Sequence, residues 1–353
     1  MSDKNNAGKI SSAFMEKVIY PSLGAKRSEI LVGPAAGLDT SVIDLGNDKV
    51  LVSSTDPISL IPVLGAEDSA WMSVNLLAND LSTSGLPPQF LLVDLNLPPD
   101  LADDTLASYW KSLSEECSRL GIAIAGGNTG KFEGCDLTIV GSGTTLAIGD
   151  RRKVISSGGA RVGDNVIISK GAAISTTGLL SRIFPNTVRR QLGTDTQEKA
   201  QSYFRIISAS ADSIRASAVG AGSEGITAIH DVAEGGVLSC MLELAGASSK
   251  GMSIDEAGIP VSEETKAICS LFEIDPYWSL GEGALVITCN PKVTTSLLRK
   301  LEEGGVRASI AGEILPKVEG IFLSQDNKKT SVLRPPSDPY WNAYYSAVAK
   351  KWD

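Results

Sequence analysis

Acidic residues near the ends of predicted strands and helices are the first candidates for chemistry. Asp39 lies in GLDTSVID, Asp56 in SSTDPI and Asp80 in VNLLANDLSTSG. An acid at the end of a strand is placed where ligand clefts form. Three carboxylates that converge on one point could hold Mg2+ bound to a triphosphate. Each acid alone also fits a plainer role, because an aspartate beside a proline forms turns and an aspartate late in a helix is solvated.

The segment AIAGGNTGKFEG, residues 123–134, is a candidate phosphate-binding loop. It follows an apolar strand and offers backbone N–H groups that can point at phosphates. It is not a Walker A sequence, which needs GxxxxGK[ST], and a plain hairpin turn fits it equally well. The candidate nucleotide-binding residues here are Gly126, Gly127, Thr129 and Gly130, and Lys131 is a candidate catalytic residue.

The segment IHDVAEGGVLSCMLELA, residues 229–245, presents a strand end followed by a helix start. The apolar strand ends in His230 and Asp231, and Gly235 and Gly236 open the helix. This order places bare amides at a positive helix end beside a carboxylate and an imidazole. The same residues also fit a β–α turn in which Asp231 caps the helix and His230 is a buried polar group.

Glu282 is a further candidate because it lies between two glycines in YWSLGEGALVIT, just before an apolar strand. Without side chains on either neighbour, its carboxylate could reach a substrate. It could equally be an exposed turn acid. Lys170 and Gly171, which follow an apolar strand at 165–169, are added to the candidate nucleotide-binding residues.

The elements that must position these residues form two regions of mixed α and β structure. Apolar periodicity and end signals predict helices at 12–19, 67–84, 103–120, 175–184, 197–218, 234–245 and 293–303. Strands are predicted at 41–45, 49–54, 90–97, 121–125, 136–148, 165–169, 227–230, 284–289, 308–314 and 320–324. The turn-rich segment 155–163 is the predicted boundary, which divides the chain into domains 1–154 and 155–353. Two α+β domains fit this order better than one continuous βαβ series.

Composition limits the classes of function. The chain has 353 residues and a net charge of −9, so nucleic acid and membrane surfaces are poor default partners. Five cysteines form no CxxC pair, and there is no apolar signal segment or membrane-spanning run, which predicts a cytoplasmic protein. The single histidine excludes sites built on several imidazoles, so a bound metal would depend on carboxylates and be Mg2+ or Ca2+.

The motifs together, in this order, resemble a known superfamily. The run GPAAGLDTSVIDLG…STDPI…NLLANDLSTSG…AGGNTG…HDVAEGG…SLGEGALVIT…GGVRASIAGEI covers roughly residues 24–316. It is similar to aminoimidazole ribonucleotide synthetase (PurM), formylglycinamidine ribonucleotide synthetase, thiamine-monophosphate kinase, selenophosphate synthetase and HypE. HDVAEGG resembles the HD-x-x-x-GG motif of HypE and of formylglycinamidine ribonucleotide synthetase, and the hydrogenase-maturation (HypE-like) branch is the nearest relative.

The resemblance implies a two-domain PurM-like α/β (α+β) fold, in which the N-terminal domain forms a dimeric β-barrel and the C-terminal domain is α/β. It implies a homodimer that binds ATP and Mg2+ in a cleft between the domains, acts on a small-molecule substrate and has a possible protein partner in a maturation pathway. By motif position the metal ligands would be Asp39, Asp56, Asp80, Asn128 and Asp231. The catalytic residues would be His230, Glu282 and Lys131, and the nucleotide would contact Gly126, Gly127, Thr129, Gly130, Lys170, Gly171, Gly235 and Gly236.

The sequence also departs from the family pattern. Relatives usually carry an acid where Asn128 stands, and HypE proteins carry a lysine one position before Lys131. HypE ends in a cysteine that carries the group being dehydrated, whereas this chain ends AVAKKWD. We therefore expect an enzyme that transfers the γ-phosphoryl group of ATP to an oxygen of a small amide or phosphate-type substrate. The alternative is a catalytically silent, nucleotide-binding maturation or scaffold protein; a selenophosphate- or thiamine-phosphate-type kinase is a weaker expectation.

Overall fold

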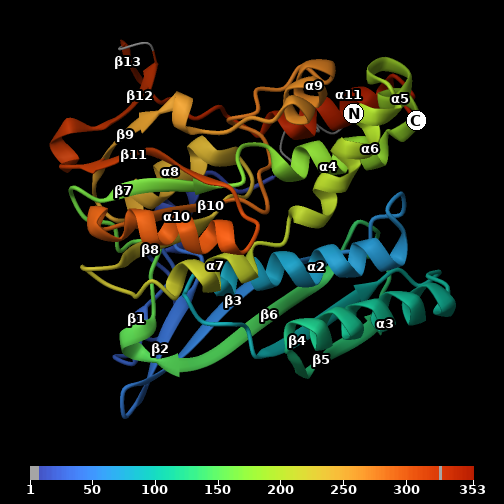
Figure 1. Ribbon diagram of the computed structural model, residues 1–353. Helices are drawn as coiled ribbons and strands as arrows, with labels where there is room; N and C mark the ends of the chain where they lie inside the picture. The colour runs from blue at the N-terminus through green and yellow to red at the C-terminus, as the bar shows by residue number, and fades with distance from the viewer. Residues whose placement is uncertain (1–7, 326–327) are drawn as a thin grey trace.

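The computed structural model describes residues 8–325 and 328–353, which form two β-sheets with helices between and around them (Figure 1). The first sheet has the strand order β1-β2-β3-β6-β4-β5, and only its β4–β5 pair is parallel. Its strands are β1 (Ile30–Val32), β2 (Ser41–Gly46), β3 (Lys49–Ser59), β4 (Phe90–Leu97), β5 (Ala123–Lys131) and β6 (Ile139–Asp150).

Alternation along the first sheet decides which face is buried. In β4 every second residue, from Leu91 to Leu97, is buried under α2 (Gly65–Ser82) and α3 (Asp103–Leu120). The intervening side chains point to the other face, where Phe90, Leu92 and Ile148 are each more than a third exposed. The sheet has open edges at β1 and β5, so the described residues of one copy do not close a barrel.

The central strands of the second sheet, β7, β8 and β10, are buried on both faces. Its order is β13-β12-β9-β11-β7-β10-β8, with β7 (Asn165–Ser169), β8 (Ile226–Asp231), β9 (Gly251–Asp255), β10 (Leu285–Cys289), β11 (Ala308–Leu315), β12 (Ile321–Gln325) and β13 (Lys328–Ser331). Alternate side chains of β7 point to opposite faces of the sheet. Val166 and Ile168 pack in the core beneath α8 (Gly236–Ala247), whereas Ile167 packs in the core beneath α10 (Thr294–Glu303). This explains the continuous apolar runs in its central strands.

Two predicted elements differ in the structure. The predicted helix 197–218 is divided into α6 (Thr194–Ser202), a 3-10 turn (Tyr203–Ile206) and α7 (Ser210–Ser217), because carbonyls at 206–208 accept hydrogen bonds from Lys170 and Asn79. Most of the predicted phosphate-binding loop at 123–134 is instead strand β5, which covers residues 123–131. The close approach of β5 to β4 requires Gly127, because a Cβ there would collide with the carbonyl of Val93.

Several elements were not predicted, and the N-terminal helix was predicted correctly. The predicted helix 12–19 consists of α1 (Ser12–Phe14) and a π-helical segment (Met15–Ile19). The unpredicted elements are β1, β9, β13, α5 (Pro185–Leu192), α9 (Glu263–Leu271) and α11 (Pro339–Ala349). None of the helices within residues 8–325 and 328–353 has both the length and the apolar character needed to cross a membrane.

The two halves meet where α2 lies beside α7, between the two sheets (Figure 1). The Asn79 side chain donates to the Ile207 carbonyl (2.8 Å) and accepts from the Ala209 N–H (2.6 Å). One turn further along α2, the Ser82 carbonyl accepts from the Ser213 hydroxyl (2.6 Å). These buried hydrogen bonds hold the C-terminal end of α2, and Asp80 with it, against the second half of the molecule.

Candidate active site

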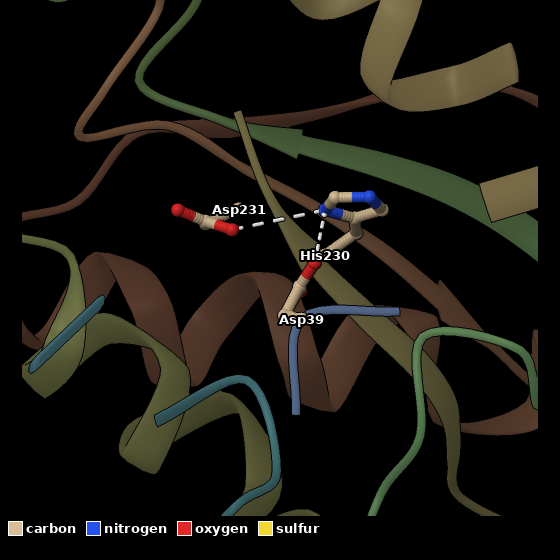
Figure 2. Close-up of side chains that lie close together, drawn as sticks. All are labelled: Asp39, His230 and Asp231. Atoms are coloured by element: carbon tan, nitrogen blue, oxygen red, sulfur yellow. Dashed lines mark ion pairs between the residues drawn. The ribbon is translucent and has the colours of Figure 1, made fainter. Parts of the chain in front are cut away.

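Three of the predicted residues meet at the end of β8 (Figure 2). His230 Nδ1 lies 3.0 Å from Asp39 Oδ1 and 3.7 Å from Asp231 Oδ1. Asp39 precedes β2 and so comes from the first half of the molecule, where its other oxygen accepts a hydrogen bond from the Ser157 hydroxyl (3.0 Å). Potential ligand atoms of the three residues lie within 4.8 Å of one another, with all three side chains buried.

Asp56 and Asp80 form a second pair of carboxyl groups at the same place. Asp56 lies on the inward side of β3, and Asp80 lies near the C-terminal end of α2. The two side chains are close enough to share a hydrogen bond, and the Ser54 hydroxyl donates to Asp80 Oδ2 (3.1 Å). Asp231 acts electrostatically on both, which joins this pair to the group at the end of β8.

Glu282 completes the cluster from the loop before β10. Glu282 lies three residues before Leu285, the first residue of β10, which is paired with Asp231 at the end of β8. Burial, followed by the charges of Asp231 and Asp56, holds the pKa of Glu282 well above its usual range. We call Asp39, Asp56, Asp80, Asp231 and Glu282 the acid cluster.

The acid cluster is short of positive charge. Burial raises the pKa of Asp39 to about 7, against the opposing charge of His230. Burial, then the neighbouring carboxylates, also raises the pKa of Asp80 well above its usual range. Carboxyl oxygens crowded in this way favour a proton or a metal ion, and they are the ligands that Mg2+ prefers. The donor set therefore fits a divalent cation.

His230 is enclosed by acids rather than open to the site. Burial alone would lower the pKa of its imidazole, but Asp39 and other neighbours raise it well above the usual range. On the side away from Asp39, Nε2 lies 3.5 Å from Glu243 Oε2. A buried imidazolium between carboxylates holds those carboxylates in place, and its own nitrogens do not face a ligand.

Lys9 is a site residue that the sequence did not reveal. Its backbone N–H donates to Glu234 Oε1 (3.0 Å), which places the N-terminal segment on the HDVAEGG loop. Burial would lower the pKa of its ammonium group, but four carboxylates raise it above its usual value. Three of these four, Asp231, Glu282 and Asp80, belong to the acid cluster. A lysine in a polar N-terminal segment carries no local signal for such a position.

Residues of β5 do not reach the acid cluster. Asn128 is exposed, and its amide donates to Asp94 Oδ1 (3.4 Å) on the neighbouring strand. The Lys131 ammonium donates to the Leu101 carbonyl (2.7 Å) and pairs with Asp103 (2.8 Å). The exposed backbone of Gly126, Gly127 and Thr129, and the partly exposed Gly130, lie on the same edge strand.

The other predicted nucleotide-binding groups already have partners. The Lys170 ammonium donates to two carbonyls, at Ile206 and Ser208, and pairs with Asp212 (2.8 Å). Gly171, with φ +136°, packs against the Pro260 carbonyl. At the start of α8, the Gly235 N–H donates to Asp338 Oδ2 (2.7 Å) and the Gly236 N–H to the Ala233 carbonyl (3.2 Å). The amides at this helix start are thus satisfied within the protein.

A two-sheet fold with an acid cluster between its halves defines the structural class, and the sequence defines the family. Residues 37–148 match the AIR synthase related protein, N-terminal domain, and residues 161–323 match the C-terminal domain of the same family. The chain therefore belongs to the AIR synthase related protein family, as the motif order suggested. This is a family of enzymes: the curated relatives include a carbamoyl dehydratase and a thiamine-monophosphate kinase.

Two relatives span most of the chain. A putative hydrogenase expression/formation protein of Methanocaldococcus jannaschii is 26% identical over 94% of this chain and 96% of its own length. The carbamoyl dehydratase HypE of Cupriavidus necator is 26% identical over 79% of this chain and 80% of its own length.

Solved structures confirm the PurM-like two-domain fold. A HypE–HypF complex matches with a TM-score of 0.71 at 20% identity, over 92% of this chain and all of that one. AaThiL complexed with AMPPCP and TMP matches with a TM-score of 0.69 at 19% identity, over 92% and 98% of the two chains.

Proposed function

We propose that the protein is a Mg-ATP-dependent enzyme that transfers the γ-phosphoryl group of ATP to an oxygen of a small amide or phosphate-type substrate. The observation that carries the proposal is the convergence of the five acids from both halves of the molecule on one buried place with too little positive charge. Transfer of a phosphoryl group needs positioning and charge neutralisation more than covalent protein chemistry.

In this proposal Asp39, Asp56, Asp80 and Asp231 hold the magnesium that accompanies ATP. Bound Mg2+ supplies neutralisation of the charge on the phosphate oxygens. Asn128 and Lys131, which do not contact these acids, are left out of the central set. Lys9 replaces Lys131 as the lysine next to the reacting phosphate, because its backbone binds Glu234 in the HDVAEGG loop and the charges of the cluster carboxylates act on its ammonium group.

Glu282 is the residue proposed to orient the substrate and accept its proton. In the reaction the substrate oxygen forms a bond to the γ-phosphorus while the bond from that phosphorus to the bridging oxygen breaks, and ADP leaves. The proton that the substrate gives up, from the N–H of an amide or the O–H of a protonated phosphate, passes to the Glu282 carboxylate. His230 holds Asp39 and Asp231, and we assign it positioning rather than direct proton transfer because both ring nitrogens face carboxylates.

Two solved structures of HypE support the choice of nucleotide and the existence of a partner. HypE has been solved in complex with ATP and also in complex with HypF. We propose that this protein also binds ATP, works in the cytoplasm and engages a protein partner in a maturation pathway. We further propose a homodimer, formed through the open face of the first sheet, where apolar Phe90, Leu92 and Ile148 are exposed.

The test is thermal unfolding combined with phosphorus NMR. Mg2+ and ATP together should raise the melting temperature more than either alone, since a ligand at about 100 times its dissociation constant adds roughly 2.7 kcal/mol. ADP should then appear when a correct small-molecule substrate is present. Binding without ADP formation across substrate candidates would favour the silent maturation protein. Absence of any shift at millimolar Mg-ATP would contradict the nucleotide proposal itself.

A further inference from the structure

The segment after β13 contacts Gly235 and Glu243, which follow Asp231, and then packs back on the core. Its helix α11 buries Tyr340, Ala343 and Ala347 in the largest core cluster, and Asp338 caps that helix by accepting from the Tyr340 N–H (2.8 Å). The other Asp338 oxygen accepts from the Gly235 N–H (2.7 Å). Residues 334–338 therefore form a strap, anchored in the core, across the turn that follows Asp231.

Arg334 connects this strap to the acid cluster. Its Nη1 lies 2.8 Å from Glu243 Oε1, and its Nη2 would lie 3.2 Å from a Cβ at Gly235. The second oxygen of Glu243 lies 3.5 Å from His230 Nε2. One carboxylate thus has a guanidinium on one side and the imidazole on the other.

The charges explain what this arrangement does. Burial alone would raise the pKa of the Glu243 carboxyl, but the nearby His230 imidazole, with the charges of Lys9 and Arg334, lowers it to about 2. The Glu243 carboxyl is therefore ionised, and its negative charge interacts with both the Arg334 guanidinium and the His230 imidazole. Without the guanidinium, more of that charge would act on the imidazole, drawing it away from Asp39 and Asp231 on its other side.

We propose that Arg334 is a positioning residue for the acid cluster: by pairing with Glu243 it keeps His230 against Asp39 and Asp231, and so sets the affinity of the site for a divalent cation. Arg334 and Asp338 lie beyond residue 323, where the match to the family domain ends. The predicted effect of Arg334 on cation affinity rests on the proposed function, whereas its predicted effect on the surroundings of His230 does not.

The effect of Arg334 on His230 can be measured directly, because His230 is the single histidine of the sequence. A histidine-free purification tag leaves one imidazole in the sample, so its ring proton and nitrogen signals belong to His230. R334Q should shift these signals, and R334K should return them most of the way to the wild-type values. R299Q is the matched control, because it removes a pair between Arg299 and Glu303 (3.0 Å) on the exposed side of α10 and should leave the signals unchanged.

The effect of Arg334 on cation affinity is measured with Mg2+. R334Q should raise the Mg2+ concentration needed for half-maximal ATP turnover by about 10-fold, the lower end for partners that orient metal ligands. The KM for ATP at saturating Mg2+ should change less, and R334K should recover most of the Mg2+ affinity. If R334K is as impaired as R334Q although both are folded, the charge-based assignment is wrong.

A double-mutant cycle decides whether Glu243 carries the effect. In an E243Q background, adding R334Q should produce no further shift of the His230 signals and no further loss of Mg2+ affinity. Should R334Q fail to fold, the E243Q and R334K variants still give the ring-signal comparison. Wild-type ring signals in folded R334Q would overturn the inference. A wild-type protein that ignores Mg-ATP would instead contradict the proposed function and leave the ring-signal result standing.

Discussion

The acid cluster and strand β5 contain similar kinds of residue but have opposite surroundings. Both combine glycines with acids or amides in motifs that resemble the family. At the acid cluster, buried carboxylates from both halves crowd together, and burial raises the pKa of Asp56, Asp80 and Glu282. On β5, Asn128 is exposed and the Lys131 ammonium already pairs with Asp103. The acid cluster differs from strand β5 because its side chains converge and are buried, and not because its residue types are different.

The largest expected effect comes from removing one charge from the acid cluster. Asp80→Asn should weaken Mg2+-dependent ATP binding by at least roughly 10- to 100-fold, the loss found when only the support of a metal ligand is removed. The physical reason is that the charges of Asp231 and Asp56 act on buried Asp80, which would be a direct ligand of the metal. Isothermal titration with ATP at fixed Mg2+ measures the effect. Unchanged affinity in a folded variant would remove Asp80 from the metal site.

A smaller effect, on stability, is expected at the edge of the same region. Burial raises the pKa of Asp338 from 3.8 to about 6, against hydrogen bonds from the Gly235 and Tyr340 backbones. Because the folded-state pKa is the higher one, folding is most favourable with the proton bound, and stability is lost as pH rises through this range. The free energy of unfolding of wild type should fall by about 2 kcal/mol relative to D338N between pH 4 and pH 7.

Urea unfolding of both proteins across this pH range measures the difference. Only its change with pH is used, so that any constant loss of hydrogen bonding in D338N cancels. Parallel stability curves for the two proteins would show that Asp338 is not the titrating group.

The open face of the first sheet provides the next prediction. Leu92 is 38% exposed on β4, on the face away from α2 and α3. If two copies pair through this face, Leu92→Glu should weaken dimerisation by at least the roughly 1.5–3 kcal/mol of one buried leucine. Sedimentation equilibrium gives the association constant. Ile310→Glu, at an exposed apolar residue of the second sheet, is the control and should leave association unchanged.

The smallest effect is expected on β5 itself. Lys131→Ala removes an ammonium group that contacts the Leu101 carbonyl and Asp103. Because these contacts are at the surface, ATP turnover should stay within about 2-fold of wild type, as surface pairs contribute little. A large loss of turnover, with the fold intact by circular dichroism, would restore Lys131 to the catalytic set and weaken the contrast between the two regions.

Elements with strong periodicity were predictable from the sequence. The helix 103–120 and the strands 90–97 and 165–169 have the predicted bounds, because apolar spacing and end signals agree there. Prediction was less successful where long-range contacts decide. The helix predicted at 197–218 is interrupted because Asn79, more than 120 positions away, takes a carbonyl of that segment. Similarly, the glycines at 126–130 form a strand because β4 lies beside them.

The residue types of the acid cluster were determined by the sequence alone: Asp39, Asp56, Asp80, Asp231 and Glu282 all lie at predicted strand or helix ends, where ligands bind. Only the tertiary structure decided which groups surround them. The backbone N–H of Lys9 reaches Glu234, 225 positions away, and Arg334 reaches Glu243 from beyond β13. Such contacts leave no local pattern in the sequence, because they join residues that are far apart along the chain and are brought together only by the fold.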